Sequence, residues 1–318
     1  MRYHLKWTRK SIIHYNIFSI TPTLQGRILI KFLGLKFRFT TKKTKQIREK
    51  FINYYHSFKT ASEIPAADGD LRLIQKASAS FMEQFSLFCE ENGFRYWLDF
   101  GTLLGAVRHK DFIPWDDDVD ISMPREDYER LISQYRNGFP NNPDFEIIFD
   151  FNNRDKCFVK IKSKKTENLF IDIFPYDYYH SKLDESEKKD LSNKIANVVK
   201  KHKLKRFKNI ETIRNYFKSI TQKIINQNEI DLSTEPALFM GVDYPHRWQN
   251  KVYDWECIFP LKKIPFENKS FYAPNLPEAV LKSIFGDYMS LPKDTYPRHS
   301  GYMSVTDEER KILEEYIK

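Results

Sequence analysis

Four aspartates lie within five positions near the middle of the chain and offer its clearest candidate chemistry: Asp116, Asp117, Asp118 and Asp120. The adjoining residues 119–123, "VDISM", are mostly apolar, and we expect them to form a strand. Because side chains alternate along a strand, Asp118 and Asp120 should point to the same face. Such a pair suits Mg²⁺, which binds a few carboxylates together with substrate phosphates and water. We therefore predict that Asp118 and Asp120 are catalytic ligands of Mg²⁺ or Mn²⁺, with Asp116 and Asp117 supporting them or solvated.

A fifth aspartate stands alone in another apolar run. Asp172 lies between Ile171 and Ile173 in "NLFIDIF", a second expected strand. A carboxylate in such a place is costly to bury unless it is paired or bound to a metal ion. We therefore expect Asp172 to be the third metal ligand. The alternative is a solvated acidic turn together with a salt-bridged strand residue, and only the combination of features favours a site.

A glycine–hydroxyl pair supplies a further element of that combination. Gly101 and Thr102 follow the aromatic run "FRYWLDF" and precede a short helical stretch, "LLGAVRH". A strand, a turn and a helix in this order place backbone amides and a hydroxyl where a phosphate can bind at a helix N-terminus. Many turns contain such a pair, so it becomes specific only beside the acids. We predict that Gly101 and Thr102 hold a phosphate.

Two pairs of basic residues are candidates for contacts to substrate phosphates. Arg108 and His109 lie about two helical turns beyond Thr102, within reach of a bound diphosphate. An arginine suits that role because its guanidinium makes two parallel hydrogen bonds to phosphate oxygens. Arg298 and His299, near the C-terminus, are second candidates for binding phosphate or acceptor.

The surrounding sequence predicts helices and strands that would position these residues. Apolar residues from Leu71 to Phe88 recur at steps of three and four and predict a helix that ends at Asn92 and Gly93. Pro124 is placed to begin another helix. We expect further strands at "FEIIFD" and "KCFVKIK", two Lys-rich helices within residues 182–230, and a last helix near residues 307–317. The fold class is therefore α/β (α+β), a mixed sheet flanked by helices, with a helical insertion and an irregular C-terminal region.

The chain divides by charge into a basic arm and a slightly acidic body. Of the 52 Lys and Arg residues, 14 fall within residues 1–60, which contain a single acid, Glu49. We predict three parts: the arm at 1–60, a catalytic core at 61–180, and a helical insertion with an acceptor or substrate region at 181–318. The mixture of basic and apolar residues suits an anionic membrane surface. A solvated basic helix packed on the body is nearly as well supported, and nucleic acid is not an expected partner.

The sequence contains no apolar run long enough to span a bilayer and no secretory signal. The three cysteines are far apart in the sequence and form no CxxC motif, so we expect reduced thiols. We therefore expect a cytoplasmic protein, peripheral on the inner face of the cell membrane.

One long stretch resembles a known family. Residues 96–131, "YWLDFGTLLGAVRHKDFIPWDDDVDISMPREDYERL", are closely similar to the LicD family of phosphotransferases, which includes bacterial phosphocholine transferases and fukutin-like ribitol-phosphate transferases. The resemblance continues through "FIDIFPYDYY" and through "FGDYMSLP" with "RHS". It implies a nucleotidyltransferase-like fold in which Gly101 and Thr102 hold phosphate while Asp118, Asp120 and Asp172 hold divalent metal.

The resemblance also implies a reaction. A sugar hydroxyl of a cell-surface glycan, lipid-linked or polymeric, would attack the distal phosphorus of a CDP-linked alcohol and release CMP. Asp172 could accept the hydroxyl proton. We favour CDP-choline as the donor, because a bacterial-looking chain without an anchor fits that branch. Two alternatives stay open: transfer of a nucleoside monophosphate to a small molecule, and a non-enzymatic basic adaptor for membrane or nucleic acid.

Overall fold

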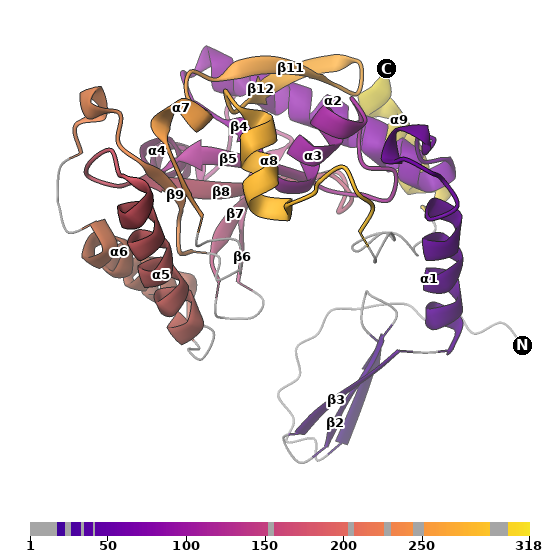
Figure 1. Cartoon of the computed structure of the whole chain (residues 1–318). Helices are drawn as coiled ribbons and strands as arrows, with labels where there is room; N and C mark the ends of the chain where they lie inside the picture. The colour runs from indigo at the N-terminus through magenta and orange to yellow at the C-terminus, as the bar shows by residue number, and fades with distance from the viewer. Residues whose placement is uncertain are drawn as a thin grey trace, which may run out of the picture.

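The computed structural model describes residues 18–22, 27–32, 35–40, 42–151, 156–202, 207–225, 230–243, 251–292 and 305–318. Its centre is a mixed β-sheet flanked by helices, as the sequence predicts (Figure 1). Within these residues the sheet has seven strands: β4 (Trp97–Leu98), β5 (Val119–Pro124), β6 (Phe145–Asp150), β7 (Phe158–Ser163), β8 (Phe170–Tyr178), β9 (Leu238–Met240) and β10 (Val252–Tyr253).

The strand order places β8 at the middle of the sheet. The order is β10-β9-β8-β5-β4, with β7 paired to the first part of β8 and β6 paired to β7. Strands β5 and β8 run parallel, whereas the other pairs are antiparallel. Both strands of the parallel pair are almost entirely buried, which explains their continuous apolar sequences.

Helices pack against this sheet through predicted apolar faces. The central helices are α2 (Gly69–Glu91), α3 (Phe100–Arg108) and α4 (Arg125–Tyr135). Helix α2 buries the predicted stripe, including Ile74, Phe81 and Phe85, and its C-terminal cap is Asn92. Helix α4 begins directly after Pro124, as expected. The C-terminal elements are α7 (Trp255–Ile258), the hairpin of β11 (Lys262–Phe266) and β12 (Lys269–Ala273), α8 (Pro277–Phe285) and α9 (Asp307–Ile317).

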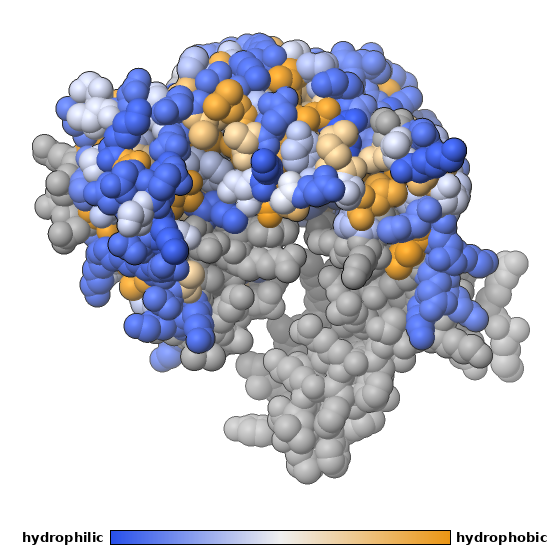
Figure 2. Space-filling view, in the orientation of Figure 1, coloured by the Kyte–Doolittle hydropathy of each residue, from blue (hydrophilic) through white to orange (hydrophobic). Residues whose placement is uncertain are grey.

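The two Lys-rich helices form with a small apolar core of their own. They are α5 (Glu185–His202) and α6 (Ile210–Ile225), which lie side by side in Figure 1. Ile195, Ile213 and Phe217 are buried between these helices and the sheet residue Phe239. The outer surface of this helical pair is mainly hydrophilic in Figure 2, whereas Lys188 of α5 is largely buried and pairs with Asp254.

The N-terminal segment contains strands that the sequence analysis did not predict. Strands β1 (Phe18–Pro22), β2 (Arg27–Phe32) and β3 (Leu35–Thr40) form a separate antiparallel sheet, followed by α1 (Lys42–Tyr55). Two short 3₁₀ turns lie at Ala61–Glu63 and Leu232–Thr234. Across the described residues, no helix combines the length and apolar character that crossing a membrane requires. All three cysteines are free thiols, as expected.

The aromatic run before Gly101 is a shorter strand than expected. Only Trp97 and Leu98 are extended, because Asp99 already caps the next helix and α3 begins at Phe100. Gly101 and Thr102 consequently lie in the first turn of α3, where the sequence analysis placed them in a turn before the helix. The backbone N–H groups of this turn still belong to a helix N-terminus, which carries partial positive charge.

Candidate active site

The three predicted metal ligands converge. Asp118, Asp120 and Asp172 each offer one carboxylate oxygen, and these oxygens lie within 4.8 Å of one another. The parallel register of β5 and β8 pairs Asp120 directly with Asp172, while Asp118 immediately precedes β5. Carboxylates are the oxygen ligands that Mg²⁺ and Mn²⁺ prefer, so this acidic triad (Asp118, Asp120 and Asp172) fits a divalent cation.

The charge of the triad supports that fit. Burial raises the pKa of Asp120 well above its ordinary value, and the nearby carboxylates of Asp118 and then Asp172 raise it further. Like charges held this close destabilise each other unless a cation offsets them. Asp118 also belongs to a second close group with Asp116 and Asp117, whose ligand oxygens likewise lie within 4.8 Å. The acidic region therefore extends beyond the triad.

A lysine that the sequence analysis missed contacts the triad. Lys160 lies on β7 opposite Asp172, and its Nζ donates a hydrogen bond to Asp172 Oδ1 at 2.5 Å. Burial lowers the pKa of Lys160, but the neighbouring Asp172 outweighs this effect and leaves the pKa raised. In the sequence this residue is one of several lysines alternating with apolar residues, and nothing distinguished it from a solvated one.

Gly101 allows α3 to approach the acids. A Cβ at this position would lie 2.7 Å from Asp116 Oδ2 and 3.8 Å from Asp120 Oδ2. The first distance is shorter than any ordinary contact, so a side chain here would displace the Asp116 carboxylate. Thr102 is buried, and its Oγ1 accepts a hydrogen bond of 2.8 Å from the backbone N–H of Asp120. These two residues thus place the start of α3 directly beside the triad.

Asp99 connects the elements behind the triad. Its fully buried carboxylate accepts hydrogen bonds from the Phe100 N–H, the Ser122 hydroxyl and the Tyr176 hydroxyl at 2.7–2.9 Å. Its own N–H donates to the Asp120 carbonyl. Burial raises the pKa of Asp99 to about 6, although all three hydrogen bonds act to lower it. In the sequence this residue looks like part of a strand, and only the structure reveals that it joins α3, β5 and β8.

Arg108 presents an unused hydrogen-bond donor near the acids. The guanidinium is buried, and its Nη1 donates to the Tyr288 carbonyl at 2.8 Å. Its Nη2 is also buried and has no hydrogen-bond partner among the described residues. Burial lowers the pKa of Arg108 to about 10, and attraction to Asp116 opposes that shift. A buried cation with a spare donor, close enough to Asp116 to interact with it, suits a phosphate oxygen.

His109 holds the guanidinium of Arg108. Its Nε2 accepts a hydrogen bond of 3.0 Å from Arg108 Nε, which requires a neutral ring. Burial and then the charge of Arg108 lower the pKa of His109 to about 4, against the opposing effect of Asp111. His109 is therefore neutral at ordinary pH. Arg298 and His299, the second pair of candidates, lie outside the described residues.

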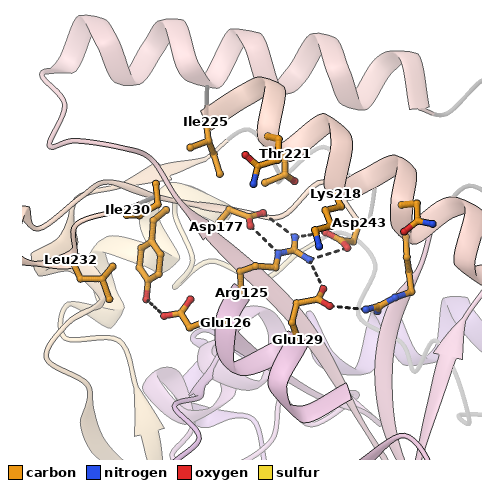
Figure 3. Close-up of a pocket in the computed structure, with 14 residues that line it drawn as sticks. Arg125, Glu126, Glu129, Asp177, Lys218, Thr221, Ile225, Ile230, Leu232 and Asp243 are labelled. Atoms are coloured by element: carbon orange, nitrogen blue, oxygen red, sulfur yellow. Dashed lines mark hydrogen bonds and ion pairs between the residues drawn. The ribbon is translucent and has the colours of Figure 1, made fainter. Parts of the chain in front are cut away.

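A cavity of about 500 Å³ lies away from the triad, between α4, α6 and the end of β8 (Figure 3). At its floor Arg125 donates to both oxygens of Asp177 and of Asp243, at 2.5–3.0 Å. Asp177 is five residues beyond Asp172 on β8, so it lies roughly 16 Å further along the strand and on the opposite face, and Arg125 begins α4 directly after β5. Asp177 and Asp243 thus form a separate cluster of acids, which Arg125 holds together.

Comparisons with known proteins agree with the resemblance. A family model described as LicD/FKTN/FKRP, nucleotidyltransferase domain, matches residues 93–218. The lipopolysaccharide cholinephosphotransferase LicD of Haemophilus influenzae is 28% identical over 260 residues, which cover 72% of this chain and 96% of that protein.

Two eukaryotic relatives match a shorter region. The ribitol 5-phosphate transferase FKRP of Homo sapiens is 35% identical over 88 residues, or 27% of this chain and 18% of that protein. Mannosyltransferase regulator 4 of Saccharomyces cerevisiae is 32% identical over 83 residues, or 26% of this chain and 7% of that protein. Residues 93–218, which contain Asp118, Asp120 and Asp172, are thus similar to the nucleotidyltransferase domain of the LicD family.

Proposed function

We propose that this protein transfers a phospho-alcohol from a CDP-linked donor to a sugar hydroxyl of a cell-surface glycan, such as lipopolysaccharide or teichoic acid, and releases CMP. The observation that carries the proposal is the convergence of Asp118, Asp120 and Asp172, within a LicD-family domain, beside a helix N-terminus. Such a site can bind metal and phosphate together, and this combination is what phosphoryl transfer requires.

Phosphocholine is the favoured group. The cholinephosphotransferase of Haemophilus influenzae aligns over nearly its whole length, whereas the ribitol-phosphate relative aligns over a short region. The identity of the alcohol depends on side chains around the site rather than on the fold, so CDP-ribitol and CDP-glycerol are tested beside CDP-choline.

In the proposed mechanism, Asp118, Asp120 and Asp172 would hold Mg²⁺ or Mn²⁺, which would neutralise charge on the donor diphosphate. The amides at the start of α3, with Gly101 and Thr102, hold a phosphate by the helix dipole. Arg108 Nη2 donates to another diphosphate oxygen.

The proposed reaction is an in-line displacement at the distal phosphorus of the donor. The sugar oxygen forms a bond to the distal phosphorus, and the bond from this phosphorus to the bridging oxygen of CMP breaks. CMP leaves with the electron pair, and Asp172 accepts the proton of the sugar hydroxyl. The residues contribute by positioning both reactants and by neutralising charge.

The test is incubation of the purified chain with Mg²⁺, each of the three CDP-alcohols, and acceptor glycan. We expect CMP to accumulate, fastest with CDP-choline, and EDTA to stop its release. Pyrophosphate released from a nucleoside triphosphate would instead favour the nucleotidyltransferase alternative, a class that the family model's description includes. No CMP from any donor would refute the proposal.

The adaptor alternative predicts a different pattern in cells. If the acids were only structural, Asp118→Ala and Asp120→Ala would leave the biological role intact, and removal of residues 1–60 would abolish it. We expect the reverse order of importance for glycan modification. Measuring the phospho-alcohol on the surface glycan of cells that carry each variant separates the two.

A further inference from the structure

We propose that Lys160 is a positioning residue that holds Asp172 in the orientation in which it binds metal. The inference rests on the metal site of the proposed function and adds a residue to it. Lys160 and Asp172 are paired across the antiparallel strands β7 and β8, and Lys160 Nζ lies 2.5 Å from Asp172 Oδ1. This lysine therefore contacts an acid of the triad directly.

The ammonium group of Lys160 is closely restrained. Its side chain is 19% exposed, and Nζ lies 5.3 Å from the ring centroid of Phe158 and 4.3 Å from that of Phe170. Lysine is seldom buried to this degree without a compensating partner, and two aromatic faces with one carboxylate define a single place for the charge. The geometry is that of a fixed charge rather than of a flexible surface lysine.

The neighbouring lysines identify what is special about Lys160. Lys162 lies two residues further along the same face of β7, and its side chain is equally buried, at 16% exposure. Its partners are Glu146 and Glu167, which lie outside the triad. Lys162 therefore provides a matched control: the same strand, face, residue type and burial, with different acids.

The reason Asp172 needs such a partner is the repulsion within the triad. Three carboxylates whose oxygens lie within 4.8 Å push one another apart before any cation arrives. A hydrogen bond from Lys160 to one oxygen opposes that movement and fixes the plane of the carboxylate. Groups that orient metal ligands in this way commonly change metal affinity or activity by about 10- to 100-fold when they are removed.

The test measures binding of Mn²⁺ by electron paramagnetic resonance, in which only the free ion gives the strong signal. The variants are Lys160→Met, Lys160→Gln, Lys160→Arg, Lys162→Met and Asp172→Asn, each checked for folding by circular dichroism and thermal unfolding. We expect Lys160→Met and Lys160→Gln to weaken Mn²⁺ binding at least about 10-fold. Lys160→Arg, which keeps charge and donors, should restore most of the affinity, and Lys162→Met should bind as the natural chain does.

Several outcomes would overturn the proposal. If Lys160→Met binds Mn²⁺ equally or more tightly, the lysine only offsets negative charge and does not position Asp172. If Lys162→Met weakens binding as much, the effect belongs to the strand. If Lys160→Met does not fold, the Mn²⁺ affinity of Lys160→Gln decides between these outcomes. Failure of the proposed function can be told apart from failure of this proposal. If only the function is wrong, Mn²⁺ still binds in a Lys160-dependent way while no CDP-alcohol yields CMP. A natural chain that binds no Mn²⁺ would refute the metal site itself.

Discussion

Asp120 and Asp172 face each other as directly paired residues of the parallel strands β5 and β8. Their separation is therefore set by backbone hydrogen bonds of the sheet rather than by flexible loops. Residues built on paired strands hold their geometry more accurately than residues on loops. The site is accordingly rigid at its acids, and substitutions there should affect chemistry more than folding.

The first prediction concerns the acids themselves. Asp120→Asn keeps the shape of the side chain but removes its charge, and it also relieves repulsion with Asp118 and Asp172. We expect CMP release to fall by about 10²- to 10³-fold, the scale on which losing one group that stabilises transition-state charge acts. The free energy of unfolding without metal should be unchanged or higher. Both quantities are measured with purified protein, by CMP assay and by urea unfolding.

The control for this prediction is Asp150→Asn. Asp150 is an equally well buried acid of the same sheet, but it pairs with Lys156 outside the triad. It should lower stability modestly and retain most of the CMP release. Equal loss of activity in both variants would mean that the assay reports folding.

Two glycines of α3 should respond differently to the same substitution. In Gly101→Ala the new methyl group clashes with the Asp116 carboxylate, a side chain able to move, and reaches ordinary contact with Asp120 Oδ2 at 3.8 Å. In Gly105→Ala it meets the Asp111 carbonyl at 2.6 Å and the Ile113 nitrogen at 3.1 Å, which are backbone atoms. We expect Gly101→Ala to reduce CMP release more than stability, and Gly105→Ala to lower stability by about 1–3 kcal/mol.

Thermal and urea unfolding together with CMP assays check this pair. Activity loss in Gly101→Ala should not recover at lower temperature, because it comes from a displaced acid rather than from unfolding. A Gly101→Ala chain with full activity would contradict the close approach of α3 to the acids.

The buried carboxyl of Asp99 predicts a pH dependence of stability. Its pKa is raised by burial to about 6 in the folded chain, so between about pH 4 and pH 6 the folded state binds more protons than the unfolded state. Its contribution to stability is therefore present at low pH and is lost as pH rises through this window, by about 3 kcal/mol in all.

Asp99→Asn removes that titration. We expect the unfolding free energy of the natural chain, relative to that of Asp99→Asn, to fall as pH rises from 4 to 7. Urea unfolding of both chains at a series of pH values measures this difference. A difference that stays constant with pH would contradict the raised pKa.

Substitution of Arg108 should weaken binding of the CDP-alcohol donor more than binding of the acceptor glycan. Arg108→Lys keeps a charge but loses the forked donors, one of which lacks a protein partner within the described chain. We expect the KM for the CDP-alcohol to rise about 10-fold, with a smaller change in the KM for the glycan. His109→Gln, which can still accept from Arg108 Nε through its amide oxygen, should be milder than His109→Ala.

The basic N-terminal arm should bind anionic membranes. Residues 1–60 carry 14 of the basic residues and one acid, and each basic residue near an anionic surface contributes about 1 kcal/mol. We expect cosedimentation with vesicles containing phosphatidylglycerol, weakened in high salt and by Lys42→Glu with Lys43→Glu. Equal binding to neutral vesicles would contradict an electrostatic attachment.

The sequence predicted those parts of the fold that depend on local patterns. The apolar stripe of α2, the proline before α4 and the alternating acids of β5 are each encoded within a few adjacent residues. The convergence of Asp172 with Asp118 and Asp120 was predicted because an isolated acid in an apolar strand needs a partner. In these cases the physical requirement can be stated for one segment at a time.

What the sequence did not predict depends on partners far along the chain. Lys160 looks like any other lysine until β7 pairs with β8, and Asp99 looks like a strand residue until Ser122 and Tyr176 reach it. The strands β1–β3 were not predicted, although apolar and polar residues alternate in Leu35–Thr40, because no single period runs through residues 1–60 as a whole. The domain boundaries at residues 60 and 180 stay predictions.

Helices α5 and α6 pack on the sheet through an apolar core that is distinct from the main one. Within the described chain, six of its eleven buried residues come from the pair, and the others include Phe239 of β9, so mutations there disturb packing within the pair and against the sheet. The backbone hydrogen bonds between β5 and β8 fix the relative positions of Asp120 and Asp172, which therefore tolerate less movement. Substitutions on the solvated outer face of this pair can therefore accumulate without moving Asp120 and Asp172.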